Sequence, residues 1–409
     1  MKLACTAALL LLLLLGGACS NGAASPTQTA TATEPKTTPT ATVSPPPPAT
    51  DTAVPPSPTV ATLEPAATTG PDWPLFESPE YGVQAFMWWR PDLARRDLQL
   101  IREMGFGWVK QGFAWRDIET NVKGEYDWWK ADTIVQQVED AQLKLLVRLD
   151  HQPFWAQADP DTPLNNAPPG DLQDFGDFCG ALASRYAGRI AAYQVWNEPN
   201  LTREWGNEVP DPAAYTNLLQ VCYEAIKAND PQAIVISAGL APTGQSPPIA
   251  IPDTEFLQGM YEAGAAAYFD VLGLNAPGYA APPEMSPEEA ADTYRHRSFT
   301  FRRVEDMRQI MVDNGDEEKQ VAILEMGWTL DPVNADYAWY AVDAETQADY
   351  LVRAYQYARK NWQPWIGLMT TIYIADYTWT EENEQYWWAI TLPDGTPRPA
   401  YYALKEMQK

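Results

Sequence analysis

Ala-Ala-Tyr-Gln-Val-Trp-Asn-Glu-Pro-Asn, residues 191–200, is a short apolar run that ends in a glutamate, Glu198. Its branched and aromatic residues are typical of a β-strand, and the proline that follows Glu198 ends the strand. A second run of this kind is Gln-Val-Ala-Ile-Leu-Glu-Met-Gly-Trp, residues 320–328, which contains Glu325. The two glutamates are 325 − 198 = 127 residues apart. Only a fold that aligns the two strand ends can bring both carboxyl groups to one cleft.

From residue 81 onward, short β-rich runs alternate with amphipathic helical stretches. The predicted strands are residues 81–88, 107–115, 144–150, 190–196, 233–239, 270–275, 320–324 and 367–375. The predicted helices are residues 91–104, 128–142, 172–186, 212–228, 254–267, 296–314, 345–361 and a last stretch from about residue 398. Repeated strand-then-helix units predict an α/β fold of the (β/α)8 TIM-barrel type in a single domain. No Gly-x-Gly-x-x-Gly follows the first strand, which disfavours a dinucleotide-binding sheet.

Two segments of different composition precede this domain, which we place at residues 73–409. Residues 1–19 are predicted to be a signal peptide, with a charged start at Lys2, a short apolar run and small residues before Cys19. The cysteine after small residues resembles a bacterial lipobox and predicts lipidation of Cys19, with an ordinary cleaved signal as the alternative. Residues 20–72 are rich in Thr, Pro and Ala and predict a disordered tether, because they have too little apolar surface to bury.

The chain is strongly acidic, with 28 Lys and Arg against 54 Asp and Glu and a formal net charge of −26. This charge argues against nucleic acid and against anionic lipid surfaces as partners. Contact with a membrane is expected only through the lipid anchor. We therefore expect an extracytoplasmic protein, secreted or anchored to the outer face of the cell membrane, and a monomer.

Two cysteines remain outside the predicted signal peptide, Cys179 and Cys222, on successive predicted helices. They either form a disulfide, as an oxidising compartment permits, or remain as two buried thiols. The chain has two histidines, His151 and His296, and no Cys/His spacing typical of zinc. We expect no metal ion and no organic cofactor.

The two glutamate stretches resemble motifs of one enzyme group. Trp-Asn-Glu-Pro at residues 196–199 is similar to the fourth-strand motif of clan A glycoside hydrolases, which include families 5 and 39. Ile-Leu-Glu-Met-Gly-Trp at residues 323–328 resembles the seventh-strand nucleophile motif of that clan. The resemblance covers the domain from residue 81. It implies a hydrolase of β-glycosidic bonds that retains anomeric configuration, with Glu198 as general acid/base and Glu325 as nucleophile. Retention would place the two carboxyl groups about 5 to 5.5 Å apart.

The same resemblance assigns further residues around the cleaved sugar. Asn197 would hydrogen-bond the sugar 2-hydroxyl, and His151, at the end of the third strand, would line the subsite that is cleaved. Lys110 lies where family 5 often has an arginine that supports the nucleophile. Lysine keeps the charge of that arginine but lacks its planar fork. In the sixth strand, where relatives often have His-x-Tyr, this chain has Asn275 and Tyr279. Tyr279 is expected to donate to the nucleophile and Asn275 to contact the sugar, with plain loop roles as the alternative.

Aromatic side chains are abundant, with 17 Trp, 20 Tyr and 11 Phe. The apolar faces of sugar rings stack on such side chains. The tryptophans nearest the predicted strand ends are Trp88, Trp89, Trp115, Trp155, Trp205, Trp328 and Trp379. Trp379, just beyond the eighth strand, is the leading candidate for a platform under the cleaved sugar, and Trp328 is a second candidate contact.

The predicted substrate is thus an extracellular oligo- or polysaccharide, and the choice of glycan is left to loops that the motifs do not determine. Three alternatives stay open. The first is a glycan-binding surface lipoprotein without turnover. The second is a transglycosylase with the same residues, which an apolar acceptor side built by Trp205 and Trp328 would favour. The third is a structural surface protein whose tether is the functional part, and it predicts no cleft.

Overall fold

A computed structural model of the chain describes residues 75–159 and 166–409. The predicted signal peptide at residues 1–19, the lipidation of Cys19 and the tether at residues 20–72 lie outside the described residues. Within the described ranges, no helix is both long enough and apolar enough to cross a membrane.

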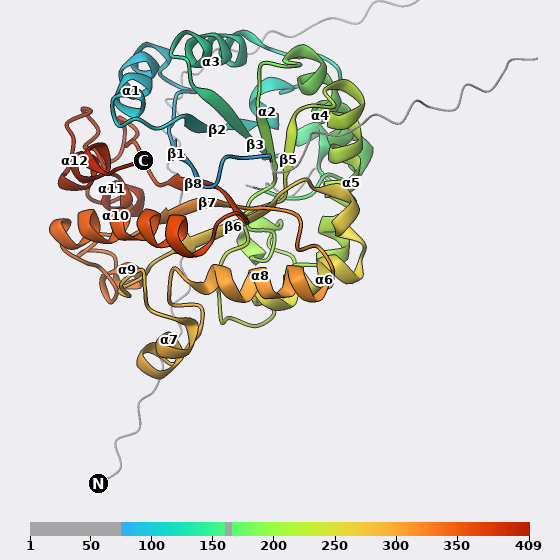
Figure 1. Ribbon diagram of the computed structural model, residues 1–409. Coiled ribbons are helices and arrows are strands. Elements are labelled where there is room, and N and C mark those ends of the chain that lie inside the picture. Colours follow the sequence, from blue (N-terminus) through green and yellow to red (C-terminus); the bar gives the residue numbers. More distant parts are fainter. Residues whose placement is uncertain (1–74, 160–165) are drawn as a thin grey trace, which may run out of the picture. The chain divides into compact units, whose positions relative to one another are not determined.

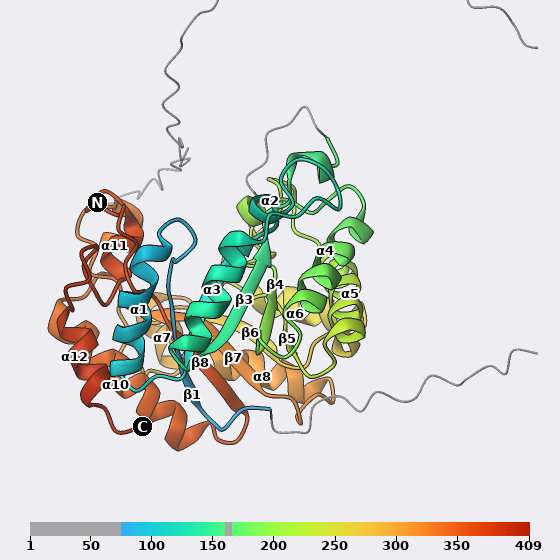
Figure 2. The ribbon, with the colours of Figure 1, turned by 90° about the horizontal axis from the view of Figure 1, so that it is seen from above.

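The described residues form a barrel of eight parallel strands surrounded by helices (Figure 1, Figure 2). The strands are β1 (Glu80–Gln84), β2 (Trp108–Ala114), β3 (Lys144–Asp150), β4 (Ala192–Val195), β5 (Ile234–Ile236), β6 (Leu272–Pro277), β7 (Val321–Gly327) and β8 (Ile366–Thr371). They pair in the order β5-β4-β3-β2-β1-β8-β7-β6. Two parallel bridges, Ile236 with Val271 and Leu240 with Leu274, link the sides of β5 and β6. The predicted (β/α)8 barrel is confirmed.

The longer helices around the barrel are α1 (Pro91–Glu103), α3 (Trp129–Asp140), α4 (Leu172–Arg185), α5 (Pro212–Asn229), α6 (Asp253–Glu262), α8 (Arg303–Asp313), α10 (Ala344–Asn361) and α12 (Pro399–Glu406). Shorter helices lie in the connections: α2 (Trp115–Ile118), α7 (Pro287–Tyr294), α9 (Ala335–Ala338), α11 (Glu384–Trp388) and single turns of 3₁₀ helix at Phe154–Ala156, Thr202–Glu204 and Ala265–Tyr268.

Aspartate caps begin several of the ring helices. The side chain of Asp211 accepts from the backbone N–H groups of the first turn of α5, and Pro212 occupies the first helical position. Asp171 and Asp343 cap α4 and α10 in the same way. These side chains satisfy N–H groups that have no partner inside the helix, so each helix starts at a defined residue after its strand.

The predicted elements differ from the observed ones mainly on the β6–β7 connection. The predicted helix at residues 296–314 begins only at Arg303, because Thr300 donates to the carbonyl of Met285 and holds the preceding chain in a turn. The sequence prediction also missed α7, which begins with a capping box formed by Ser286 and Glu289. Strand β7 is longer than predicted, so Glu325 lies within it.

The interior of the barrel has an apolar layer and, above it, a charged one. The apolar layer is buried and contains Phe76, Trp108, Leu146, Ala192, Ile236, Leu324 and Leu368. Side chains of a strand alternate between its two faces, so the next inward positions of β2 and β3 are those of Lys110 and Arg148. The apolar layer closes the bottom of the barrel and leaves these charged groups to face the other end.

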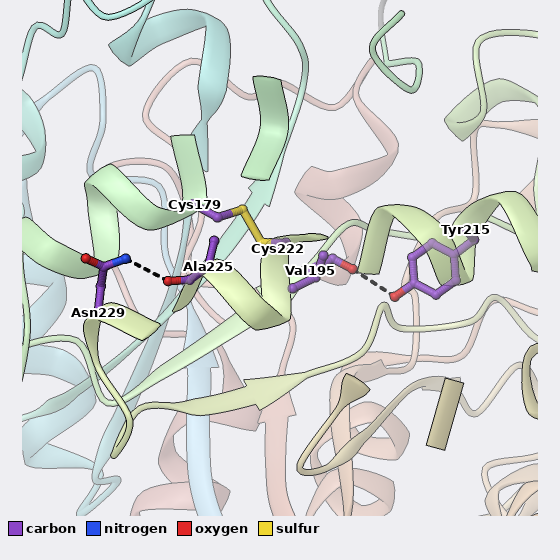
Figure 3. Close-up of a disulfide and its surroundings, with 6 residues drawn as sticks. All are labelled: Cys179, Val195, Tyr215, Cys222, Ala225 and Asn229. Atoms are coloured by element: carbon purple, nitrogen blue, oxygen red, sulfur yellow. Dashed lines mark hydrogen bonds between the residues drawn. A yellow bond between two sulfur atoms is a disulfide. The ribbon is translucent and has the colours of Figure 1, made fainter. Parts of the chain in front are cut away.

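Cys179 of α4 and Cys222 of α5 form a disulfide, the first of the two possibilities left open by the sequence (Figure 3). Helix α5 is also fixed to the barrel by Tyr215, whose hydroxyl donates to the carbonyl of Val195 at the end of β4. Figure 3 shows both contacts on the same helix. The disulfide joins α4 to α5, and this hydrogen bond joins α5 to β4, the strand that precedes Glu198.

Replacing both cysteines by alanine is expected to lower the free energy of unfolding. The disulfide joins cysteines 43 residues apart in sequence, and a loop of that length corresponds to about 2 to 4 kcal/mol of lost unfolded-state entropy. Urea unfolding of the double alanine variant and of the oxidised wild type measures the difference. Equal stability of the two proteins would contradict a stabilising role, and the reduced wild type should behave like the variant.

Candidate active site

A cavity of about 1060 Å³ opens at the end of the barrel to which the carboxyl ends of the strands point. Both Glu198 and Glu325 line it. The cavity is walled by residues from the connections after β1, β4, β5, β6, β7 and β8. The barrel therefore joins the two distant glutamates in one site, as their sequence contexts predict.

Glu198 lies just after β4 and is held at both carboxylate oxygens. Asn275 Nδ2 donates to Oε1 at 3.0 Å, and Arg203 Nη2 donates to Oε2 at 2.9 Å. Burial raises the pKa of Glu198, the positive charge of Arg203 opposes that rise, and the negative charge of Glu325 adds to it. The net direction is upward, so this carboxyl group holds a proton more readily than an ordinary glutamate.

Glu325 points into the barrel because β7 contains a bulge. Leu274 of β6 pairs with Ile323, whereas the next residue of β6, Asn275, pairs with Glu325, so β7 has one extra residue between the pairs. A bulge of this kind changes which way the following side chain points. Here it allows Leu324 to belong to the apolar layer while Glu325 lines the cavity.

Two cations face Glu325 from inside the barrel. Lys110 Nζ donates to Glu325 Oε1 at 3.1 Å and to the carbonyl of Leu324 at 3.1 Å. Arg148 Nη1 lies 3.7 Å from Glu325 Oε1. The side chain of Lys110 is 1% exposed, and this burial lowers its pKa to about 8 even though Glu325 acts in the opposite direction. Lys110 is still largely protonated at neutral pH, so Glu325 has a positive partner there.

A chain of polar contacts continues from Arg148 along the end of β3. Arg148 Nε lies 2.8 Å from Asp150 Oδ2, and His151 Nδ1 lies 2.6 Å from Asp150 Oδ1. Burial alone would raise the pKa of Asp150, but Arg148 and His151 outweigh it and lower the pKa to about 2. Asp150 is therefore ionised. It forms an ion pair with the guanidinium and a hydrogen bond with the imidazole of His151, which lines the cavity.

Several residues of the site have a backbone conformation that non-glycine residues seldom adopt. The φ angle is 60° at His151, 72° at Trp196, 45° at Glu198 and 54° at Tyr279. Left-handed conformations of this kind cost free energy and are concentrated at functional sites, where the surrounding fold maintains them. Each of these four residues follows a barrel strand directly or by a short connection.

The remaining predicted contacts are divided between the cavity and the core. Asn197 and Trp379 line the cavity with Asn275, and Asn197 Oδ1 accepts from Gln194 Nε2 at 3.3 Å. The ring of Trp379 is packed edge-on against Phe86, with ring centroids 4.8 Å apart. Among the other tryptophans named from the sequence, Trp89 lines the cavity, whereas Trp88, Trp115 and Trp205 are buried in the core.

Two expectations about individual residues need correction. The hydroxyl of Tyr279 donates to the carbonyl of Pro242, at 3.1 Å, and not to Glu325. Trp328 is 0% exposed and is absent from the cavity wall, so it cannot stack on a sugar. Its indole donates to the carbonyl of Ala281 and packs against Gly278, where any side chain would collide with the ring. Trp328 thus supports the connection that carries Tyr279.

Several polar residues of the cavity wall were missed in the sequence, and four of them contribute to the arrangement of the site. Arg148 had a signal, because it is the one charged residue within the run of residues 145–149, which is otherwise apolar. Gln84 ends β1, is buried, lines the cavity, and its Oε1 has no hydrogen-bond partner among the described residues. Arg203 and Glu384 lie in connections, where the sequence carries no periodic signal. Burial raises the pKa of Glu384, as it does that of Glu198.

Within the described residues, no group of three or more His, Cys, Asp or Glu side chains is arranged to hold a metal ion. The chemistry available in the cavity is that of two carboxyl groups in contrasting surroundings. Glu198 has a raised pKa, and Glu325, whose side chain is shielded to a similar degree, lies close to both a lysine and an arginine. Such a pair separates the roles of proton donor and anion.

No protein-family model matches the sequence, and no curated protein is significantly similar to it. Solved structures share the fold. A family 39 glycoside hydrolase from Bacteroides cellulosilyticus WH2 superimposes with a TM-score of 0.58 at 21% identity, over 80% of this chain and 63% of the other. The GH39 enzyme from Xanthomonas axonopodis pv. citri gives a TM-score of 0.58 at 20% identity, over 83% of this chain and 67% of the other.

A third structure, GH5_18 from Streptomyces cattleya in complex with GlcNAc, gives a TM-score of 0.57 at 15% identity, over 81% of this chain and 80% of the other. The chain spans 63% of the length of the Bacteroides enzyme, slightly less than two thirds. At these identities the likeness concerns the fold alone. The described part of the chain has a TIM barrel like those of clan A glycoside hydrolases.

Proposed function

We propose that this protein is a retaining glycoside hydrolase that cleaves β-glycosidic bonds in an extracellular glycan. The observation that carries the proposal is the contrast between Glu198 and Glu325 within one cavity. Glu198 has a raised pKa, and Glu325 is paired with Lys110 Nζ at 3.1 Å. Glycoside hydrolysis requires a carboxylic acid and a carboxylate on either side of the scissile bond.

In the proposed reaction, the Glu198 carboxyl group donates its proton to the glycosidic oxygen as the bond from that oxygen to the anomeric carbon breaks. A Glu325 carboxylate oxygen attacks the anomeric carbon from the opposite face and forms a glycosyl ester. Glu198, now ionised, removes a proton from water. The resulting hydroxide adds to the anomeric carbon and releases Glu325 as a carboxylate.

The surroundings of each glutamate suit these roles. Lys110 and Arg148 stabilise Glu325 as an anion before it attacks and after it is released. Arg203 and Asn275 donate to the two oxygens of Glu198, which stabilises the ionised form that acts as base in the second step. The opposing effects of burial and Arg203 on Glu198 are appropriate for a group that must be an acid first and a base afterwards.

Side chains around the pair supply contacts for an uncharged sugar. Trp379 offers an aromatic surface for the apolar face of a sugar ring. The unpartnered Oε1 of Gln84 can accept a hydrogen bond from a sugar hydroxyl. Asn197 and His151 line the same cavity, and we assign them to the ring that is cleaved.

The alternatives receive less support. A structural protein with a functional tether predicts no cleft, whereas a cavity of about 1060 Å³ holds both glutamates. An apolar acceptor side built by Trp205 and Trp328 would favour a transglycosylase. Both rings are buried, so they do not form such a surface. A glycan-binding protein without turnover would have no use for a carboxyl pair in contrasting electrostatic surroundings.

We place the protein outside the cytoplasm. The disulfide between Cys179 and Cys222 supports this placement, because such bonds persist in oxidising compartments. The apolar start of the chain and Cys19 add the proposal of a lipid anchor at the outer face of the membrane.

Glu325→Gln is expected to lower kcat by at least about a thousandfold, because the amide cannot form the glycosyl ester. Sugar release from a panel of β-glucans, xylans, mannans and aryl β-glycosides measures this. Glu382→Gln is the matched control, since Glu382 is an exposed carboxylate between Trp379 and Glu384 that does not line the cavity. In the same assay, NMR should detect the β-anomer as the first product. An initial α-anomer, or unchanged turnover in Glu325→Gln, would refute the mechanism.

Arg203→Gln is expected to move the basic limb of the kcat/KM profile to higher pH. Removing the cation beside Glu198 raises the pKa of that acid further, so it stays protonated to a higher pH. The Arg203 side chain is 66% exposed, so solvent screening limits the shift to roughly one pH unit or less. Arg203→Lys should restore most of the wild-type profile. A basic limb that does not move would remove Glu198 from the role of acid.

Cys19→Ser in the full-length chain is expected to abolish incorporation of radiolabelled palmitate and to move the protein from the membrane fraction to the soluble fraction of a bacterial host. Cys5→Ser serves as the control, because Cys5 lies within the predicted signal peptide and should leave labelling unchanged. Absence of label from the wild type would leave an ordinary cleaved signal as the correct interpretation.

A further inference from the structure

A second group of aromatic side chains lies in the cavity wall, on the connections that follow β6 and β7. We call it the aromatic rim, and it consists of Tyr279, Phe299, Tyr337, Trp339 and Tyr340. Neighbouring rings contact one another: the centroids are 4.8 Å apart for Tyr279 and Phe299, and 5.1 Å apart for Tyr279 and Tyr340. The rim is therefore a packed cluster and not a set of isolated surface rings.

Trp339 is the exposed member of the aromatic rim. Its ring packs edge-on against Phe299 at 5.3 Å and against Tyr340 at 4.7 Å, yet the residue is 54% exposed and lines the cavity. Neighbouring rings thus limit its orientation while more than half of its surface stays available. Exposed tryptophans held in this way are typical of binding surfaces, because little conformational entropy is lost when a ligand covers them.

The aromatic rim lies on the Glu198 side of the cavity. The hydroxyl of Tyr279 donates to the carbonyl of Pro242, in the connection after β5. Asn275 of β6, the strand that leads to Tyr279, donates to Glu198 Oε1 at 3.0 Å. The ring of Trp339 is stacked with that of Tyr279, with centroids 6.4 Å apart. Because the general acid must reach the glycosidic oxygen, the sugar that leaves with that oxygen lies on its side of the cleavage point.

We propose that Trp339 forms a distant sugar-binding subsite for the leaving-group portion of an extended, uncharged glycan. This inference rests on the proposed hydrolase function and on the assignment of Glu198 as the acid. It identifies the substrate class as a chain that continues past the sugar next to the cleaved bond. A compact leaving group would not reach the Trp339 ring.

The charge of the cavity wall favours uncharged sugars. Its carboxyl groups are those of Glu198, Glu204, Glu325, Asp336, Asp376 and Glu384. Its guanidinium groups are those of Arg148 and Arg203, and each is already paired with carboxylates. A uronate or sulfated sugar would meet excess negative charge and find no free cation in this part of the described chain.

Trp339→Ala tests the proposal with two classes of substrate. For β-linked gluco-, xylo- and manno-oligosaccharides from disaccharide to hexasaccharide, we expect kcat/KM for the longer members to fall roughly tenfold, because a stacking contact is lost. Aryl β-glycosides should be cleaved at the wild-type rate, since their leaving group is a single small ring. Trp129→Ala is the matched control: Trp129 is also 54% exposed, but it lies on α3 and does not line the cavity.

Binding of the same oligosaccharides to Glu325→Gln and to Glu325→Gln/Trp339→Ala, measured by calorimetry, separates the subsite from the reaction. If the Trp339 change weakens binding but the wild type shows no turnover, the proposed subsite stands and the proposed hydrolase function is wrong. If the wild type and Trp339→Ala turn over every chain length equally fast, the proposed subsite is wrong and the proposed hydrolase function stands. A uronate-substituted chain bound more tightly than its neutral counterpart would overturn the uncharged substrate class.

Discussion

The buried contact between Lys110 and Glu325 is the constraint on which the site depends. An ammonium group that is 1% exposed inside a barrel must have partners, and it has the Glu325 carboxylate and the carbonyl of Leu324. Both partners come from β7, so the cation of β2 links two strands that β1 and β8 separate in the barrel wall. Arg148 and Asp150 extend this charged layer, and the apolar layer below it keeps water from the barrel floor.

The sequence allowed the architecture and the central carboxyl pair to be predicted because both have local signals. Strand and helix periodicity repeats along the domain, and Glu198 and Glu325 each follow an apolar run. The direction of Glu325 had no such signal. It depends on a bulge in β7 that is defined only by pairing with β6. Simple alternation would place Leu324 and Glu325 on opposite faces of the strand.

Connections explain most of the remaining differences. The sequence placed Trp328 near the substrate because it follows a strand end, but whether such a ring faces the cavity or the core is determined by what packs beside it. Gly278 leaves room for the indole beneath its backbone, and Trp328 becomes part of the support of the β6 connection. Trp339 is also a tryptophan after β7, yet its neighbours hold it at the edge of the cavity. Neither outcome has a periodic pattern in the sequence.

The disulfide has a further consequence for how the chain responds to proteolysis. Cys179 and Cys222 close a covalent ring of chain that includes β4, Glu198 and Arg203. A single cut anywhere inside that ring leaves two polypeptide pieces that are still joined through the sulfur atoms. The segment that carries the proposed acid therefore stays attached after such a nick, and α5 can remain anchored to β4 through the hydroxyl of Tyr215.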